Sequence, residues 1–255
     1  MSKLFLSVVI PSYNEEANLK RGVLSEIHDF MLGQNISWEV IISDDGSTDG
    51  SRKFVDTQIK NWKHFTQLQN KHGGKPYALW QGIKKARGKF VLFADMDQST
   101  PIDQVLKLIP YTKKNFSVVI GSRGLNRENF PLYRKIGSAV FMTFRKSLIL
   151  SEIDDTQCGF KMFDRVSVKK AFPKLEFFRK KQNVTGWKVT SYDVELLHIL
   201  KNMGNKIKEV KVDWDDRDES TSKGGALKKY ANESLEMILQ ILRIKMNDRR
   251  GMYTK

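Results

Sequence analysis

The stretch Phe90–Pro101 reads FVLFADMDQSTP, and it decides the fold class. It begins with a short apolar run of the kind found in strands that are buried on both faces of a parallel sheet. The run ends in two acids, Asp95 and Asp97, with one residue between them. Side chains of an extended chain alternate between faces, so both carboxylates are expected to point the same way. Because like charges this close repel each other, the pair predicts a neighbouring cation.

Four further apolar runs predict strands of the same sheet, at residues 5–10, 38–43, 65–69 and 117–122. Helical patterns separate these strands, at residues 15–32, 50–62, 76–86 and 102–113. Pro76 and Pro101 stand where helices begin. Repeated alternation of strand and helix predicts an α/β fold with a twisted, mostly parallel sheet flanked by helices and with right-handed crossovers.

The second half of the chain is less regular. Helices are expected at residues 134–150 and 192–204, and a late strand at 206–214. From Leu227 to Leu242 apolar residues recur at helical spacing, which predicts a C-terminal amphipathic helix over residues 227–245 followed by a basic tail. We therefore expect one α/β domain over residues 1–226 and a helical appendage over residues 227–255.

The composition limits the partners. The chain has 255 residues and a net charge of +15, which favours nucleic acid, an anionic membrane surface or a phosphorylated substrate. The single cysteine, Cys158, excludes an internal disulfide and fits a reducing compartment. No apolar run is long enough to span a bilayer, so any membrane contact is expected to be peripheral. No nucleic-acid-binding module is recognisable, so that alternative depends on charge alone.

Polar clusters follow three of the predicted strands, where ligands bind in such sheets. The clusters are residues 11–16, 44–51 and 95–101. Asp95 and Asp97 suit a hard divalent cation such as Mg²⁺ or Mn²⁺, and the sequence lacks the clustered cysteines and histidines that zinc prefers. Asp, Ser and Gly at these places also build turns and helix caps, which is the alternative interpretation. Lys75 follows paired glycines before a helix, an arrangement that suits an anion.

Together the three clusters resemble glycosyltransferase family 2, whose fold is called GT-A. That family has Pro-x-Tyr-Asn-Glu after the first strand, Asp-Asp-Gly-Ser after the second and an acid-x-acid pair at the metal. Here these motifs stand at residues 11–15, 44–47 and 95–97. Further segments, including DTQCGFK at residues 155–161, resemble the branch that glycosylates polyprenyl phosphates and are most similar to dolichyl-phosphate β-glucosyltransferases. The resemblance covers most of residues 5–223 and implies a Rossmann-like GT-A fold.

The resemblance also implies roles for individual residues. Positions that line the nucleotide are Pro11, Tyr13, Glu15, Asp45 and Asp95, to which the loop chemistry adds Asp44 and Lys75. Positions at the metal are Asp95 and Asp97, with Gln98 beside them. Positions at the acceptor phosphate are Arg123, Arg134, Ser138, Ser222 and Lys223. The residues expected to carry catalysis are Asp95, Asp97, Arg123, Arg134 and Arg217.

The implied reaction is the inverting transfer of a hexose, favoured as glucose from UDP-glucose, onto a polyprenyl or dolichyl phosphate. It implies a divalent metal, Mg²⁺ or Mn²⁺, and a cytoplasmic protein peripheral on the cytosolic face of an anionic membrane. The alternatives left open are a GDP-mannose-dependent polyprenyl-phosphate mannosyltransferase and a soluble GT-A enzyme acting on a saccharide or protein. A basic nucleic-acid-binding protein is the non-enzyme alternative. The oligomeric state and the lipid length stay open.

One loop departs from the pattern of the family, and two further features allow two interpretations each. Relatives keep a shorter interval with a glycine between the arginine and the Ser-Lys pair, whereas this chain reads RDESTSK from Arg217 to Lys223. Asp193 falls where hydroxyl-accepting relatives have a general base, but its helical neighbours favour a structural role equally. The C-terminal helix is expected either at a membrane or packed against the domain or a second copy.

Overall fold

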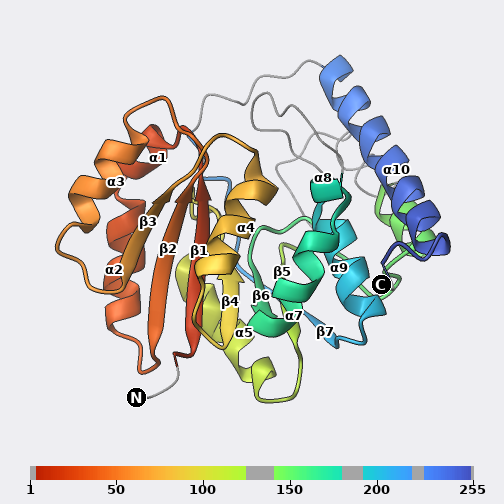
Figure 1. Cartoon of the computed structure of the whole chain (residues 1–255), viewed down its shortest axis with the longest axis horizontal. Helices are drawn as coiled ribbons and strands as arrows, with labels where there is room; N and C mark the ends of the chain where they lie inside the picture. The colour runs from red at the N-terminus through yellow and green to blue at the C-terminus, as the bar shows by residue number, and fades with distance from the viewer. Residues whose placement is uncertain (1–3, 125–140, 180–191, 220–226, 254–255) are drawn as a thin grey trace.

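The structure is a computed structural model that describes residues 4–124, 141–179, 192–219 and 227–253, without the side chains of residues 227–235. The strands of this part of the chain are β1 (Leu6–Ser12), β2 (Trp38–Asp44), β3 (Phe65–Gln69), β4 (Phe90–Phe93), β5 (Val118–Ser122), β6 (Lys161–Asp164) and β7 (Ile207–Lys211). They form a single sheet in the order β3-β2-β1-β4-β6-β5-β7 (Figure 1). Every pairing is parallel except the two that β6 makes with β4 and β5. The predicted mostly parallel α/β sheet is confirmed.

The strand β6 is the element of the sheet that the sequence did not predict. It has four residues, and Lys161 and Asp164 bracket its apolar pair, so no periodic pattern marks it. Because β6 runs antiparallel to β4, it begins at the edge of the sheet where β4 ends: Lys161 lies opposite Phe93. The segment that precedes β6 is therefore brought to the end of the sheet at which ligands are expected.

Helices lie on both faces of the sheet (Figure 1). They are α1 (Glu16–Lys20), α2 (Val23–Leu32), α3 (Ser51–Ile59), α4 (Lys75–Lys85), α5 (Val105–Thr112), α7 (Arg165–Ala171), α8 (Glu176–Arg179), α9 (Tyr192–Asn202) and α10 (Leu227–Arg249). Residues 141–148 are helical as well, and the start of the helix predicted over residues 134–150 lies outside the described residues. Short 3₁₀ turns stand at Ile102–Gln104 and Phe172–Lys174. The helix predicted over residues 15–32 is two helices, because Gly22 adopts a φ of 94° that favours glycine and interrupts the helical course.

Two apolar layers hold the helices on the sheet. Successive residues of each strand point to opposite faces, so Val8 and Val9 of β1 belong to different layers. The layer of Val9 receives α4, α7 and α9, and the layer of Val8 receives α2, α3 and α5. Burial on both faces explains why β1, β2, β4 and β5 read as apolar runs in the sequence, whereas the edge strands β3 and β7 are only partly buried.

The C-terminal helix α10 extends to Arg249, beyond the predicted end at residue 245. Ile241 and Ile244 are buried in the layer of α9. Beyond the helix, the Tyr253 hydroxyl donates to the Glu195 carboxylate at 2.8 Å. The second half of α10 therefore packs on the domain, one of the outcomes expected for it, while the boundary at residue 226 stays a prediction. No helix in the described part of the chain combines the length and apolarity that crossing a bilayer requires.

Candidate active site

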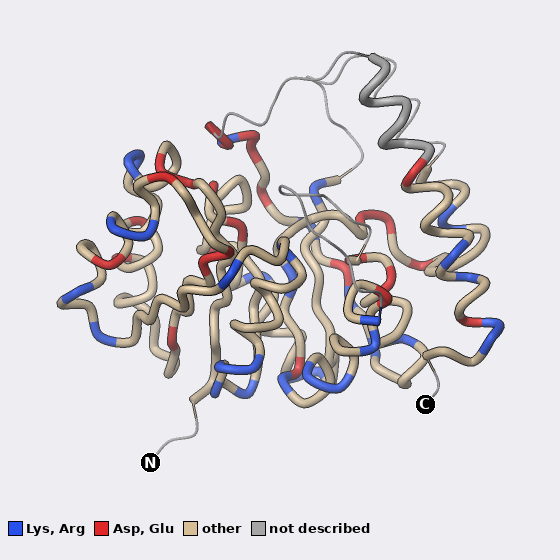
Figure 2. Tube along the Cα trace, turned by 45° about the horizontal axis from the view of Figure 1, so that its top comes forward, with Lys and Arg blue, Asp and Glu red and all other residues tan. Residues whose placement is uncertain are grey.

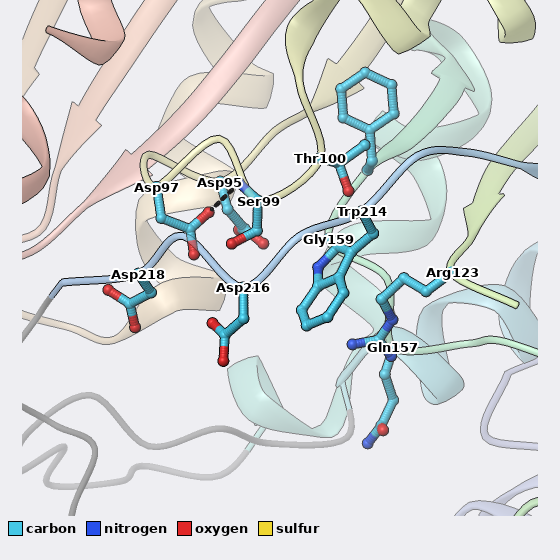
Figure 3. A pocket seen from close by; sticks show the side chains of 11 residues that line it. Asp95, Asp97, Ser99, Thr100, Arg123, Gln157, Gly159, Trp214, Asp216 and Asp218 are labelled. Atoms are coloured by element: carbon cyan, nitrogen blue, oxygen red, sulfur yellow. Dashed lines mark hydrogen bonds between the residues drawn. The ribbon is translucent and has the colours of Figure 1, made fainter. Parts of the chain in front are cut away.

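A cavity of about 190 Å³ lies beyond the carboxyl end of β4 (Figure 3). Its charged lining consists of Asp95, Asp97, Asp216, Asp218 and Arg123. The remaining lining residues are Ser99, Thr100, Gln157, Gly159, Phe160 and Trp214. The structure thus brings together three residues of the predicted site, which are Asp95, Asp97 and Arg123, and adds two acids from the loop after β7.

The cavity is acidic although the chain is basic. Four carboxylates face one guanidinium there, and Figure 2 shows acidic segments over the upper edge of the sheet and basic segments along its lower edge. Burial and the nearby charge of Asp95 raise the pKa of Asp97, whose Oδ1 accepts from the Ser99 amide at 2.8 Å. A phosphate that entered alone would meet like charge, so this lining favours a phosphate that arrives with a cation.

Asp95 is held by a lysine from the start of α4. The Nζ of Lys75 lies 2.6 Å from Oδ1 of Asp95, with side-chain exposures of 24% and 37%. Burial opposes the charge of Asp95, but the attraction of Lys75, aided by Lys161 and Arg123, outweighs it and lowers the pKa of Asp95. The carboxylate is therefore ionised at neutral pH.

A second ion pair lies within electrostatic reach of the first. The Nζ of Lys161, a residue of β6 with a side-chain exposure of 1%, donates to Oδ1 of Asp193 at 2.8 Å and to the carbonyl of Cys158. Asp193 thus serves a buried lysine, which supports the structural role among the two weighed for it. Positive and negative groups therefore alternate in the order Lys75, Asp95, Lys161 and Asp193. These residues come from α4, the loop after β4, the strand β6 and the helix α9, respectively.

Gly159 makes room for Asp95. A Cβ atom at residue 159 would lie 1.9 Å from Oδ2 of Asp95, a distance that no side chain tolerates. The absent side chain of Gly159 therefore leaves the space that the carboxylate occupies, while Lys75 holds its other oxygen. Both observations fix the position of Asp95 at the wall of the cavity.

Arg123 follows β5 and is clamped by Asp155. Its Nε and Nη2 donate to the two carboxylate oxygens at 2.7 and 2.8 Å, and its amide donates to Oδ2 at 3.1 Å. Burial opposes the charge of Asp155, but these bonds outweigh it, and the pKa of Asp155 lies well below its ordinary value. The guanidinium also lies 5.7 Å from the ring centre of Trp214. Arg123 is therefore positioned before any ligand arrives.

Three of the residues predicted at the nucleotide, which are Tyr13, Glu15 and Asp45, lie directly after β1 and β2. Tyr13 stacks on His72 with ring centres 4.5 Å apart. The carboxylate of Asp45 accepts from the amides of Gly73 and Gly74 at 2.9 and 2.7 Å, and lies 3.0 Å from Nδ1 of His72. His72 was not predicted as a site residue, because the four histidines are scattered along the chain and none belongs to a motif. Its stacking on Tyr13 makes it a candidate for the nucleotide site.

Pro11 and Asp44, also predicted at the nucleotide, are buried in β1 and β2. The carboxylate of Asp44 accepts from Nε of Arg52 at 2.5 Å and from the amides of Gly46 and Ser47. Asp44 thus organises its own loop, which is the turn chemistry weighed as the alternative for this motif.

The loop after β7 is fastened to α1. Arg21 donates to the carbonyls of Arg217 and Asp97, and the side-chain Nδ2 of Asn18 donates to Oδ1 of Asp218 at 3.2 Å. Arg217 itself points away from the cavity, with Nη2 3.2 Å from Oε1 of Glu26 on α2. The guanidinium of Arg217 is thus engaged at the surface in this arrangement, and the catalytic role expected of Arg217 stays a prediction.

Gln98 does not line the cavity in the described part of the chain. Its side chain is buried and its amide nitrogen donates to the carbonyl of Asp95 at 2.8 Å. The remaining residues expected at the acceptor, which are Arg134, Ser138, Ser222 and Lys223, lie outside the described residues.

The lining fits a divalent cation in part. Carboxylate oxygens are the donors that Mg²⁺ and Mn²⁺ prefer, and the ammonium of Lys75 already stands in for a cation at Asp95. Within the described ranges, however, no three side chains of His, Cys, Asp or Glu come together as ligands. Asp95 and Asp97 would therefore supply two ligands, and oxygens of a bound phosphate group would have to complete the shell.

The fold recurs in solved structures of sugar-transferring enzymes. Glucosyl-3-phosphoglycerate synthase from Mycobacterium tuberculosis, crystallised with Mn²⁺ and UDP-glucose, matches with a TM-score of 0.63 at 17% identity, over 94% of this chain and 79% of that one. Mannosyl-3-phosphoglycerate synthase from Rubrobacter xylanophilus matches with a TM-score of 0.62 at 14% identity, over 97% of this chain and 75% of that one. The fold is that of the GT-A glycosyltransferases.

Sequence comparison places the chain more closely. Residues 7–172 match glycosyl transferase family 2. The dolichyl-phosphate β-glucosyltransferase of Saccharomyces cerevisiae is 31% identical over 273 residues, which cover 98% of this chain and 77% of that protein. The human dolichyl-phosphate β-glucosyltransferase is also 31% identical, over 82% of this chain and 67% of that protein. The chain belongs to glycosyl transferase family 2, which confirms the resemblance.

The geometry of Gly159 gives a first prediction. Gly159→Ala should reduce glycosyl transfer roughly 100-fold, because the new methyl group displaces Asp95 and a shift of about 1 Å in a catalytic group costs that much. The melting temperature should change little by comparison. Gly33→Ala is the matched control, since a Cβ there meets only the Phe30 carbonyl at 3.5 Å. Unchanged transfer in Gly159→Ala would contradict the positioning role.

The pKa of Glu15 gives a second prediction. Burial, with the charges of Asp218 and Asp97, raises this pKa from 4.5 to about 7, although Asn18 opposes the shift by a hydrogen bond. The folded protein therefore holds a proton that the unfolded chain releases, and the free energy of unfolding falls as the pH rises from about 4.5 to about 7.

Glu15→Gln removes this titration. The free energy of unfolding is measured by urea denaturation for both proteins. The value for Glu15→Gln minus the value for the unchanged protein should increase as the pH rises from 5 to 8. Glu236→Gln on the exposed surface of α10 is the control and should run parallel to the unchanged protein. A constant difference between Glu15→Gln and the unchanged protein across this pH range would show that Glu15 has no raised pKa.

Proposed function

We propose that the protein transfers glucose from UDP-glucose to a dolichyl or other polyprenyl phosphate, with inversion at the anomeric carbon. The observation that carries the proposal is the similarity over nearly the full chain to dolichyl-phosphate β-glucosyltransferases. The choice of donor is supported by solved neighbours of the same fold that were crystallised with Mn²⁺ and UDP-glucose.

On the donor side, the loops after β1, β2 and β3 are proposed to supply the nucleotide contacts. Tyr13 and His72 offer flat rings for a base, and Asp45 lies 3.0 Å from Nδ1 of His72. Asp45 and Glu15, two residues after Tyr13, are proposed as acceptors for a base or ribose. A divalent ion, Mg²⁺ or Mn²⁺, held by Asp95 and Asp97 would act as a Lewis acid that stabilises the departing diphosphate. The acidic lining of the cavity agrees with this requirement for a cation.

On the acceptor side, the reaction needs no strong general base. A phosphate monoester has its second pKa near about 6, so its attacking oxygen already carries negative charge at neutral pH. The carboxylate of Asp193, the candidate base, is bonded to buried Lys161 instead. Arg123, clamped by Asp155, offers an oriented guanidinium at the cavity, and arginine binds phosphate in a fork geometry. Arg134, Ser138, Ser222, Lys223 and Arg217 stay proposed as further contacts to the phosphates.

The decisive experiment measures transfer of labelled glucose from UDP-glucose to dolichyl phosphate in detergent. We expect a glycolipid product that requires Mg²⁺ or Mn²⁺, and a loss of at least about 100-fold in Asp97→Ala, because the variant removes a proposed metal ligand. Asp213→Ala, at an exposed acid paired with Lys107, is the control and should keep full activity. Parallel reactions with GDP-mannose, and with a soluble sugar in place of the lipid, test the alternatives. Product formation only in those reactions would contradict the proposal.

A lipid acceptor also requires contact with a membrane, and α10 offers a surface for it. Leu239, Leu242 and Met246 stand three and four residues apart on one side of the helix, with exposures of 55%, 40% and 50%. Ile241 and Ile244 are buried and attach the other side of α10 to the domain, so the side chains of Leu239, Leu242 and Met246 face the solvent. Arg249 and Arg250 lie exposed at the end of the helix. We propose that this stripe enters the cytosolic surface of an anionic bilayer, as interfacial helices do.

Co-sedimentation with vesicles that contain anionic lipid tests this surface. Replacing Leu239, Leu242 and Met246 together by Ser should weaken vesicle binding at least about tenfold, because burial of one such side chain contributes about 1.5–3 kcal/mol. The matched control replaces Leu32, Leu106 and Val166, which are equally exposed and lie elsewhere, and should bind like the unchanged protein. If the α10 variant binds vesicles normally but changes its oligomeric state, the stripe is a subunit interface instead.

A further inference from the structure

The ion pair between Lys75 and Asp95 occupies Oδ1, one of the two oxygens that this carboxylate could offer to a metal ion. Lys75 is the first residue of α4, and its Nζ lies 2.6 Å from Oδ1 of Asp95. Asp95 lines the cavity, whereas Lys75 is not among the described residues that line it. Oδ2 of the same carboxylate fills the space over Gly159. Without a ligand, Asp95 is therefore already satisfied by a cation of the protein itself.

We propose that Lys75 is a built-in counterion that competes with the divalent metal for Asp95, so that the metal binds tightly only together with the diphosphate of the donor. The inference rests on the proposed function, in which Asp95 and Asp97 are metal ligands. It adds a dependence between two binding steps: the protein binds the metal weakly on its own and tightly when the nucleotide is bound.

The physical reason is repulsion between cations. A divalent ion bound to Oδ1 of Asp95 would lie within about 5 Å of the Lys75 ammonium, close enough for strong repulsion in a partly buried site. The neighbouring ligand does not compensate fully, because Oδ1 of Asp97 accepts from the Ser99 amide. Nor does the described part of the chain gather a third ligand among its His, Cys, Asp and Glu side chains.

A diphosphate changes this balance in two ways. Its oxygens complete the shell of the metal, and its negative charge lets two cations remain near each other. Lys75 also has a second acid within electrostatic reach, since Asp193 contributes to the attraction on its ammonium. It can therefore move off Asp95 without losing all compensation for its charge.

The alternative is that Lys75 only positions Asp95 for the metal. The two roles predict opposite signs. If Lys75 only positions the carboxylate, its removal disorders a ligand and weakens metal binding. If Lys75 competes, its removal frees a ligand and strengthens the binding of metal alone.

The experiment titrates the full chain with Mn²⁺ and follows free Mn²⁺ by electron paramagnetic resonance, with and without UDP. Lys75→Gln should bind Mn²⁺ alone about tenfold more tightly than the unchanged protein, a factor that corresponds to about 1.4 kcal/mol. UDP should tighten Mn²⁺ binding strongly in the unchanged protein and much less in Lys75→Gln. Circular dichroism before each titration verifies the fold.

Three variants complete the design. Lys85→Gln makes the same change of charge at the exposed end of α4 and should bind Mn²⁺ like the unchanged protein. Lys75→Arg keeps the cation and should also leave the binding of metal alone weak. Asp95→Asn should remove the tight binding that Lys75→Gln gains, which assigns the gain to this carboxylate.

Weaker or equal binding of Mn²⁺ by Lys75→Gln overturns the competition and leaves the proposed metal site standing. An equal gain in Lys85→Gln also overturns it, because the effect would then follow net charge. If no protein binds Mn²⁺ even with UDP present, the metal site of the proposed function is wrong and the competition is wrong with it.

Discussion

The alternation of charge under the cavity is the constraint on which the rest of the site depends. Lys75 pairs with Asp95 and Lys161 pairs with Asp193, and the four residues come from different elements of the fold. Lys161 is buried, and removing its partner would leave an uncompensated charge, which costs about 3–5 kcal/mol. The start of α4, the loop after β4, the strand β6 and the helix α9 must therefore keep their mutual positions if any of these charges is to stay compensated.

The antiparallel strand β6 makes this arrangement possible. In a purely parallel sheet each strand would end, and none would begin, at the edge where the cavity lies. Because β6 runs the other way, the residues before it meet the residues after β4 and β5 at this edge. Gly159 consequently faces Asp95, and Asp155 faces Arg123. One reversed strand thus connects the acids on the donor side with the arginine proposed for the acceptor side.

The sequence predicted the parallel sheet and the acids of its rim, because buried parallel strands leave continuous apolar runs and their ends leave polar clusters. It did not predict β6, whose four residues have no period, nor the partners of Arg123 and Lys161, which are distant in sequence. The double acid at Asp44 and Asp45 could be a turn or a site. In the structure the carboxylate of Asp44 accepts from amides of its own loop, whereas that of Asp45 accepts from Gly73 and Gly74, and a local pattern cannot reveal this difference.

The overall charge and the charge of the cavity have opposite signs, and both are useful to an enzyme that handles phosphates. A net charge of +15 attracts anionic substrates and surfaces over distances comparable with the Debye length, about 8 Å at physiological salt. At contact distance the aspartates of the cavity repel the same anions. The net positive charge of the chain attracts a diphosphate, but the diphosphate can bind in the cavity only when cations compensate the charge of the aspartates. Lys75, which lies beside Asp95, supplies part of that compensation before any ligand is bound. The repulsion among the aspartates of the cavity is therefore reduced in the folded protein without a ligand.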